Sequence, residues 1–484
     1  MRRRPNTSNA SPRQLQFNLH LFTYGALHIY AIAGAMMIGA ALGLVSIKSS
    51  ILHYLADPSR MAAMYMAGRL VTTAAFVGCG LMLLRLGRLR LGSLAVGAFG
   101  AAIFLMTPAA VVQAHVLKNH MFWAFLALCT LDRSLVLLRS GTLKDYAWAG
   151  ICAGLTMASF LGSWTACLVV AAAGTMRLAG LGGPGVAPPR LRSELQGLLL
   201  SGACAAAVFL LVNPYWILDC AEAMQELAWL RNFAVFDLSH PRLFAANALR
   251  RSITDPVLTL MFAGVAFGLI RGRRDPALLL CAVAFLMGLV AMATVPGYSA
   301  ARQARYFLGW VAVGSLLAGR LLSELCALKG LAGRFATAAA VVTLAGLGCQ
   351  GLTYAHNFHL GEGATSNHFL AGEWIERNVP KGEVIGLLRY PQPSNSPFFR
   401  FDRYRLKFIE PKLAPGLPPE KLPRWLALTI PDYDDRPELS AVLARYDKRA
   451  SFPRGKLFPW IEIDPSSTTA NPLIEVYRLR EKGA

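Results

Sequence analysis

The chain has 484 residues, of which 55% are hydrophobic and only 15% are charged, and its formal net charge is +21. These proportions exclude a disordered chain and an ordinary soluble domain, and they indicate a polytopic membrane protein. The basic residues lie mostly in short loops between apolar runs, so membrane topology explains the charge better than nucleic-acid binding does.

A polar stretch at residues 17–30, "FNLHLFTYGALHIY", places His20, Tyr24 and His28 at the start of a long apolar run. A plain membrane span does not need these side chains, so they are candidates for the lining of a substrate cavity. The run 26–47 either crosses the membrane or lies along its outer surface. In the first case residues 1–25 are inside, and in the second they are outside.

Apolar runs long enough to cross a bilayer follow along the chain. They lie near 64–84, 92–112, 120–138, 195–212, 256–271, 276–296, 306–323 and 334–353. The stretch 146–178 is too long for one span, and "SFLGSW" at its centre suits a tight reversal between two. We therefore expect a mainly α fold with about ten transmembrane helices in a domain covering residues 26–353.

The loops on one side of these spans are all basic, for example around Arg85, Arg133 and Arg271. The positive-inside rule places them in the cytoplasm. The turn 115–120, the loops 213–255 and 297–305, and everything after about residue 354 then lie outside. The prolines and the strand-like runs "RWLALTI" and "PLIEVYRL" predict a small α/β domain over 354–484, with "FLAGEWIERNVPKGEVIGLL" as a helix, a turn and a buried strand.

Several outer positions are candidates for chemistry. Arg302 and Arg305 stand at i,i+3 before a span, where paired guanidinium groups can bind a phosphate. The alternative is that they only reach lipid headgroups. Asn119 and His120 lie in an outer turn with His115 and Lys118, which either binds an anion or simply faces water.

Two further groups allow more than one interpretation. Arg69, near the outer end of its span, needs a partner or a water-filled cavity unless it reaches the headgroups. Asp219, Glu222 and Glu226 repeat at helical spacing, which favours an amphipathic surface helix with a solvated acidic face. The nine cysteines stand singly, without CxxC or Cys/His spacing, so no zinc site or disulfide framework is expected.

Taken in order, these stretches resemble the membrane glycosyltransferases of the GT-C fold, the group of protein O-mannosyltransferases and aminoarabinose transferases. The similar stretches are "FNLHLFTYGALHIYAIAGA", "MYMAGRLV", "GSLAVGAFGAAIFLMTPAAVVQAHVLKNHMFWAF", "YAWAGICAGLTMASFLGSW", "RYFLGWVAVGSLLAGRLL", "LAGEWIERNVPKGEVIGL" and "NPLIEVYRLRE". The resemblance implies a polyprenyl-phosphate-linked sugar donor, bound at the outer leaflet through Arg305, Tyr306 and Arg302. It also implies an acceptor that is a glycan, a lipid or a protein, and no nucleic acid.

The chain departs from the family pattern in three places. No acidic residue occurs before Asp57, although the family carries an Asp-Glu pair in its first outer loop. Asn119 stands where the family's outer turn has an acid, and Phe160 stands where it has a lysine. The catalytic base is therefore unassigned, and a divalent cation is compatible with the resemblance although its usual ligands are missing.

The leading hypothesis is a glycosyltransferase in the bacterial inner membrane, with the 354–484 domain on the periplasmic side. We expect an upstream start to supply the missing span and the acidic pair. The second hypothesis is a non-catalytic relative that binds a lipid-linked sugar. The third, a transporter or flippase, is disfavoured because internal repeats and mid-membrane charges are scarce.

Overall fold

The computed structural model describes residues 18–22, 24–50, 53, 58–182, 190–231, 249–294, 304–388, 396–409, 418–430, 437–461, 463 and 471–480. The chain divides into two compact units. The first comprises Met1–Ala101, Leu117–Phe244 and Met261–Leu321, and the second comprises Ala102–Val116, Ala245–Leu260 and Leu322–Ala484.

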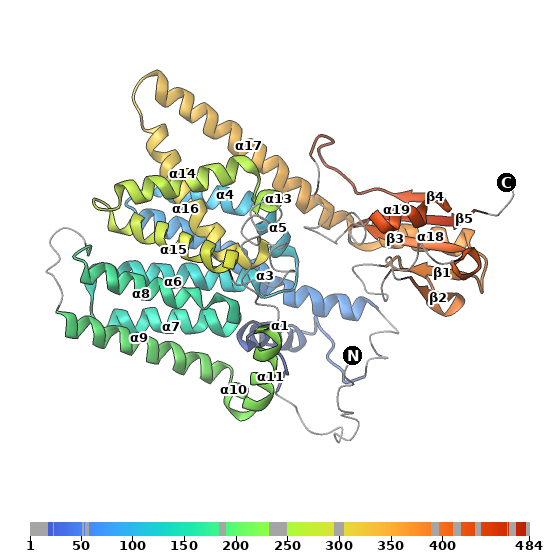
Figure 1. Cartoon of the computed structure of the whole chain (residues 1–484), viewed down its shortest axis with the longest axis horizontal. Helices are drawn as coiled ribbons and strands as arrows, with labels where there is room; N and C mark the ends of the chain where they lie inside the picture. Colours follow the sequence, from blue (N-terminus) through green and yellow to red (C-terminus); the bar gives the residue numbers. More distant parts are fainter. Residues whose placement is uncertain are drawn as a thin grey trace. The chain divides into compact units, whose positions relative to one another are not determined.

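The first unit is a bundle of helices. Its members, some of which continue into the second unit, are α1 (Ala26–Ala41), α3 (Pro58–Arg90), α4 (Leu94–Met106), α6 (His120–Ser140), α7 (Leu143–Ser159), η1 (Leu161–Ser163), α8 (Thr165–Leu178), α9 (Leu191–Val212), α10 (Tyr215–Leu218), α11 (Cys220–Arg231), α14 (Asp255–Arg271), α15 (Pro276–Thr294), η4 (Ala304–Phe307) and α16 (Leu308–Cys326). Helices α6, α7, α8 and α9 lie side by side, and α3 packs against α6 (Figure 1).

Glycine allows the closest of these approaches, between α7 and α9. A Cβ atom at Gly150 would lie 2.2 Å from the carbonyl oxygen of Ser201, and one at Gly154 would lie 2.6 Å from that of Ala205. Two small residues four positions apart on one helix let the neighbouring backbone approach closely, as in many membrane helix pairs. The "GICAG" stretch therefore fixes how α7 and α9 pack.

The predicted membrane class is confirmed, and the chain is an integral membrane protein. Among the described residues, six helices are long and apolar enough to cross a bilayer: Ala63–Arg90, His120–Ser140, Leu161–Leu178, Leu191–Val212, Arg305–Cys326 and Leu331–Leu360. A seventh span results if Leu94–Met106 and Pro108–His115, which meet at a 64° bend, count as one. The number is below the expected ten because several apolar runs form helices of fewer than 18 residues.

Helix α1 illustrates the difference. The apolar run continues to residue 47, but the helix ends at Ala41 after 16 residues. At 1.5 Å per residue it is about 24 Å long, against about 30 Å for a bilayer core. By contrast, the reversal expected at "SFLGSW" is confirmed, since α7 ends at Ser159 and α8 begins at Thr165.

The second unit contains α5 (Pro108–His115), α13 (Arg250–Ile253), α17 (Leu331–Leu360), η5 (Gly363–Thr365) and a small α/β fold. That fold comprises α18 (Asn367–Asn378), β1 (Val384–Leu387), η6 (Phe401–Arg403), β2 (Arg405–Phe408), η8 (Pro419–Lys421), β3 (Trp425–Ile430), α19 (Pro437–Leu443), β4 (Tyr446–Phe452) and β5 (Leu473–Leu479). The strand order is β2-β1-β3-β5-β4, with β1 parallel to its two neighbours and β5 antiparallel to its own (Figure 1).

The predicted helix-turn-strand and both further strands of the tail are confirmed as α18, β1, β3 and β5. Helix α18 packs on the sheet through Ile375, which is buried with Trp425 and Val476. Helix α17 runs through residue 354 without a break. The boundary expected there stays a prediction.

Candidate functional site

A cluster of aromatic and cationic side chains forms where α7, α6 and η4 meet. We call it the aromatic–cation cluster, and it comprises Tyr24, Lys118, His120, Phe160, Arg305 and Tyr306. The rings of Phe160 and Tyr306 are stacked, with centroids 5.7 Å apart and planes at 21°. The imidazole of His120 meets both rings edge-on, at 5.7 Å from Phe160 and 5.1 Å from Tyr306.

Arg305 adds a cation to this aromatic surface. Its Nη2 donates a hydrogen bond to the Tyr306 hydroxyl at 3.0 Å, and its guanidinium carbon lies 4.9 Å from the centre of the Tyr306 ring. Its Nε is buried and has no hydrogen-bond partner within the described residues. A buried donor of this kind favours an acceptor brought by a ligand.

Lys118 places a second positive charge near the first. Burial lowers the pKa of its ammonium group, and the positive charge of Arg305 lowers it further. Two cations that repel each other in a partly desolvated place are stabilised by an anion between them. Both ring nitrogens of fully buried His120 also lack partners within the described residues, so the cluster offers further unfilled hydrogen-bonding capacity.

The polar segment before α1 joins this cluster. The ring of Tyr24 lies 6.5 Å from that of Phe160. Burial raises the pKa of Tyr24, and Tyr306 raises it further. A Cβ atom at Gly25 would lie 2.0 Å from the carbonyl oxygen of Ala158, so only glycine lets the segment pass this close to the end of α7.

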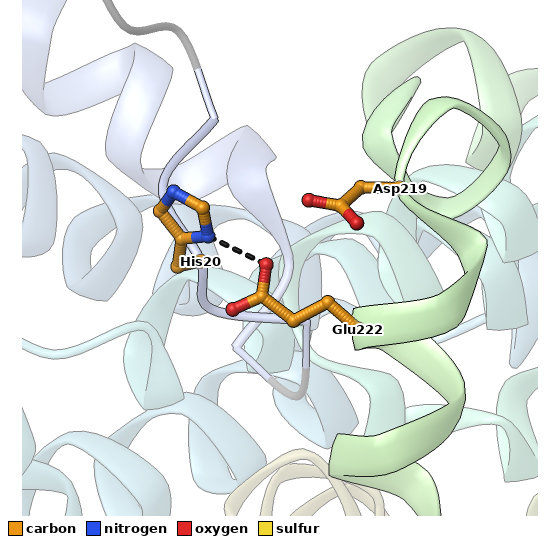
Figure 2. A group of neighbouring side chains, drawn as sticks. All are labelled: His20, Asp219 and Glu222. Carbon is orange, nitrogen blue, oxygen red and sulfur yellow. Dashed lines mark hydrogen bonds and ion pairs between the residues drawn. The ribbon is translucent and has the colours of Figure 1, made fainter. Parts of the chain in front are cut away.

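The start of the same segment takes part in a second group of side chains, of which Figure 2 shows His20, Asp219 and Glu222. We call it the acidic–histidine cluster, and it comprises Asn18, His20, Asp219, Glu222 and Glu226. The Nδ1 of His20 lies 2.6 Å from Oε2 of Glu222, and Nδ2 of Asn18 donates to Oδ2 of Asp219 at 2.9 Å. The backbone amide of Phe22 donates to Oε2 of Glu226 at 2.9 Å. The segment is thereby held against α11.

His20 has a positive φ of 50°. Few residues other than glycine adopt this region, and such strain often accompanies functional sites. The Oδ1 of Asn18 accepts a hydrogen bond from the backbone amide of His20 at 3.0 Å, which supports the turn. The imidazole is thus presented to the two carboxylates by a defined backbone geometry.

Three residues of the acidic–histidine cluster have the chemistry of metal ligands. One ligand atom each from His20, Asp219 and Glu222 lies within 4.8 Å of the others. An imidazole nitrogen and two carboxylate oxygens suit a divalent cation such as Zn²⁺ or Mn²⁺. The residues present therefore fit the cation that the family resemblance allows.

The structure brings most of the predicted candidates together. Tyr24, His120, Arg305 and Tyr306 share one cluster, while His20 joins the other. The ring of buried His28 lies 5.6 Å from that of Phe122. Asn119, also buried, donates from Nδ2 to the carbonyl oxygen of Ser159 at 2.7 Å. Arg69 is half-buried in α3 and stays a candidate, and Arg302 lies outside the described residues.

Two features of the site differ from the expectation. The acidic residues of 219–226 do not form a merely solvated face, because their carboxylates bond to the segment 18–22. The sequence marks Phe160 only as the place of a missing lysine, yet its ring contacts four aromatic partners in the first unit. The i, i+3, i+7 spacing of the acids was the available signal, but it did not reveal their partner.

Comparisons with known proteins give structural similarity alone, since no family model and no curated protein matches the chain. The oligosaccharyltransferase of Archaeoglobus fulgidus in its apo form is similar over 74% of this chain, at 16% identity and a TM-score of 0.42. The Archaeoglobus fulgidus oligosaccharyltransferase AglB, in complex with an inhibitory peptide and a dolichol-phosphate, is similar at 14% identity and a TM-score of 0.43. The chain spans about half the length of these archaeal proteins, 52% and 51%.

ArnT from Cupriavidus metallidurans bound to undecaprenyl phosphate is similar over 94% of this chain and 88% of its own, at 12% identity and a TM-score of 0.41. These three solved structures are membrane glycosyltransferases by their descriptions, the kind of protein that the sequence resembles, and each match is a likeness of structure alone. Because every TM-score is below 0.5, the function proposed for this chain rests on its own contacts.

Proposed function

We propose that the chain is a membrane glycosyltransferase that moves a sugar from a polyprenyl-phosphate donor to an acceptor at the outer face of the bacterial inner membrane. The single observation that carries this proposal is the aromatic–cation cluster. It combines Arg305, whose Nε is buried and unpartnered in the described part of the chain, with Lys118 and a stacked aromatic surface. A phosphate attached to a sugar and a lipid fits all three elements.

Arg305 and Lys118 bind the donor phosphate in this proposal. When the sugar leaves, the bond between the anomeric carbon and the phosphate oxygen breaks, and the electron pair stays on the phosphate. Two fixed cations stabilise that growing negative charge. The stacked rings of Phe160 and Tyr306 offer an apolar face for the sugar ring and the first part of the lipid.

The acidic–histidine cluster supplies the base. The acceptor hydroxyl must lose its proton as its oxygen attacks the anomeric carbon, and a carboxylate within hydrogen-bond reach can take that proton. Glu222 has this role here, with its carboxylate oriented by His20. A divalent cation held by His20, Asp219 and Glu222 would supply further positive charge for the phosphate.

The segment 18–25 connects the two halves of the proposed site. Its first residues contact the carboxylates of 219–226, and Tyr24 at its end contacts Phe160 and Tyr306. In this proposal the carboxylates around α11 provide the base, and the acidic pair expected upstream of the segment stays a prediction. The basic loops support a cytoplasmic location for the helix ends that they join. They also support an outer, periplasmic location for residues 354–484.

The test uses the full chain purified in detergent, with undecaprenyl-phosphate sugars of several kinds and membrane extracts as the source of acceptor. Release of undecaprenyl phosphate is measured. We expect Arg305→Ala to abolish both donor binding and release, while Glu222→Gln keeps donor binding and loses release. The exposed Arg88→Gln serves as a control. Unchanged donor binding in Arg305→Ala contradicts the proposal.

A second candidate function is a non-catalytic receptor for a lipid-linked sugar. Phe160 favours it, because an aromatic ring occupies the position of a lysine in the family that the chain resembles. In that case Arg305→Ala still loses donor binding, but the native chain releases no undecaprenyl phosphate with any acceptor extract.

A further inference from the structure

A cavity lined by apolar and charged side chains lies far along α6 from the proposed donor site. It has a volume of about 430 Å³ and is lined by Met82, Arg85, Cys129, Asp132, Arg133, Trp148 and Cys152. Asp132 follows His120 by twelve residues on α6, which corresponds to about 18 Å along the helix axis. The lining comes from α3, α6 and α7, and the proposed glycosyl transfer uses none of it.

Asp132 is the centre of a group of positive charges. Its side chain is only 3% exposed, and Arg90 donates from Nε to its Oδ1 at 2.7 Å. Arg85 and Arg133 face the other oxygen, Oδ2, at 3.8 Å and 3.3 Å. Three guanidinium groups around one carboxylate leave a net charge of +2. The carboxylate therefore does not neutralise the group.

The two looser arginines are the ones that face the cavity. Arg85 is 44% exposed and Arg133 is 35% exposed, whereas Arg90, which holds Asp132 most closely, is 18% exposed. Each guanidinium has five donors, and one distant contact with Oδ2 leaves most of them available. Two such forks side by side match the oxygens of a phosphate.

The remaining walls are apolar. Met82, Cys129, Cys152 and Trp148 complete the lining, and Trp148 is 47% exposed. Tryptophan is enriched at the depth of lipid headgroups, where one part of its ring system meets hydrocarbon. A cavity lined by two arginines and by apolar side chains suits an amphipathic ligand better than a free anion.

We propose that this cavity binds the phosphate headgroup of an anionic phospholipid, with the first part of an acyl chain against Trp148. Basic pockets between membrane helices, next to basic loops, are suited to anionic headgroups. The basic loops begin at this end of α3 and α6, with Arg88, Arg90 and Arg139 close in sequence. The bound lipid neutralises the excess charge around Asp132 and ties together α3, α6 and α7.

The test is native mass spectrometry of the delipidated full chain, titrated with phosphatidylglycerol, phosphatidylcholine or inorganic phosphate. We expect one tight phosphatidylglycerol site, and we expect the double variant Arg85→Gln/Arg133→Gln to weaken it about tenfold, or about 1.4 kcal/mol. The matched control is Arg88→Gln/Lys144→Gln, which removes the same number of charges from exposed positions near the end of α3 and at the start of α7. Equal losses in both double variants overturn the proposal.

A second variant keeps the charges in place and guards against misfolding. Trp148→Ala removes an exposed apolar wall without touching the arginines, and it should weaken phosphatidylglycerol binding while leaving any competition by phosphate unchanged. If inorganic phosphate competes with an affinity equal to that of phosphatidylglycerol, and Trp148→Ala changes neither affinity, the ligand is a free anion and the lipid assignment is overturned. Unaltered lipid binding in Trp148→Ala alone also contradicts it.

Discussion

Phe160 lies flat against Tyr306, with ring centroids 5.7 Å apart and planes inclined by 21°. Phe160 directly follows the last residue of α7, Ser159, and Tyr306 belongs to the short η4 helix before α16. The pair therefore fastens the end of one apolar helix to the start of another. It also places an aromatic face at the position where the sequence resemblance to GT-C glycosyltransferases implies a lysine.

Phe160→Leu should separate the contribution of the aromatic ring face to donor binding from the contribution of side-chain volume to stability. Leucine fills much of the same space, so we expect a loss of only about 1 kcal/mol in the free energy of unfolding. Donor affinity should fall about tenfold, because the sugar loses one face of its platform. Thermal unfolding and binding of an undecaprenyl-phosphate sugar measure the two effects. The control is Phe125→Leu on α6, where the ring packs near Gly78. If both variants bind donor equally well, Phe160 is not part of the platform.

The pH dependence of donor binding should report on Lys118. Burial and Arg305 lower the pKa of its ammonium group in the free protein. A bound phosphate favours the charged form and raises that pKa, so binding takes up a proton once the pH exceeds the free value. Donor affinity should therefore fall as the pH rises through the lowered pKa of Lys118.

Lys118→Gln should weaken donor binding at neutral pH and remove this part of the pH dependence. Lys144→Gln, at an exposed position at the start of α7, serves as the control and should keep it. Donor affinity of the native chain and of the two variants is measured by titration at several pH values. A native pH profile in Lys118→Gln means that another group is responsible.

In the small α/β fold of the second unit, the sequence predicted the strands that are apolar. Residues of β1, β3 and β5 are buried on the sheet, and their hydrophobic runs carry a clear strand signal. Strand β2 was missed because "RLKF" is largely exposed, and β4 was missed because "YDKRASF" carries charges along a half-exposed strand. Both lie at the edges of the sheet, where pairing on one side replaces the hydrophobic signal.

The site divides in the same way. Arg305 and Tyr306 could be proposed from the sequence because they are neighbours in one stretch, which carries the signal. The partnership of His20 with Glu222 joins positions 202 residues apart, and the spacing of acids on one helix contains no information about such a contact. Likewise, an isolated phenylalanine such as Phe160 has no polar signal. Only the packing of three helices shows that it lies beside Arg305 and Tyr306.

The acidic–histidine cluster should bind a divalent cation. Titration of the full chain with Zn²⁺ or Mn²⁺ by calorimetry should show one site, weakened about tenfold or more by His20→Ala and by Asp219→Asn. Glu226→Gln is the control, because that carboxylate contacts the Phe22 amide and is not among the three candidate ligands. Equal metal affinity in His20→Ala and the native chain contradicts the assignment, whatever the transferase activity.

Asn119→Asp introduces an acid at the position where the sequence resemblance to GT-C glycosyltransferases implies one. The buried Nδ2 of Asn119 donates to the carbonyl oxygen of Ser159 at 2.7 Å, at the end of α7. A carboxylate there would place two acceptors against each other in a buried environment. We expect a loss of about 2–3 kcal/mol in the free energy of unfolding, since a buried group is left unsatisfied, and no gain in activity.

Asn119→Ala is the matched control for that change, because it removes the hydrogen bond without adding a second acceptor. Its unfolding temperature in detergent should lie between those of the native chain and Asn119→Asp. The difference between the two variants should shrink at acidic pH, where the introduced carboxyl group becomes protonated and can again donate to the Ser159 carbonyl. If Asn119→Asp is stable and more active than the native chain, position 119 is a place from which a carboxylate can act in catalysis. The assignment of the base to Glu222 is then contradicted.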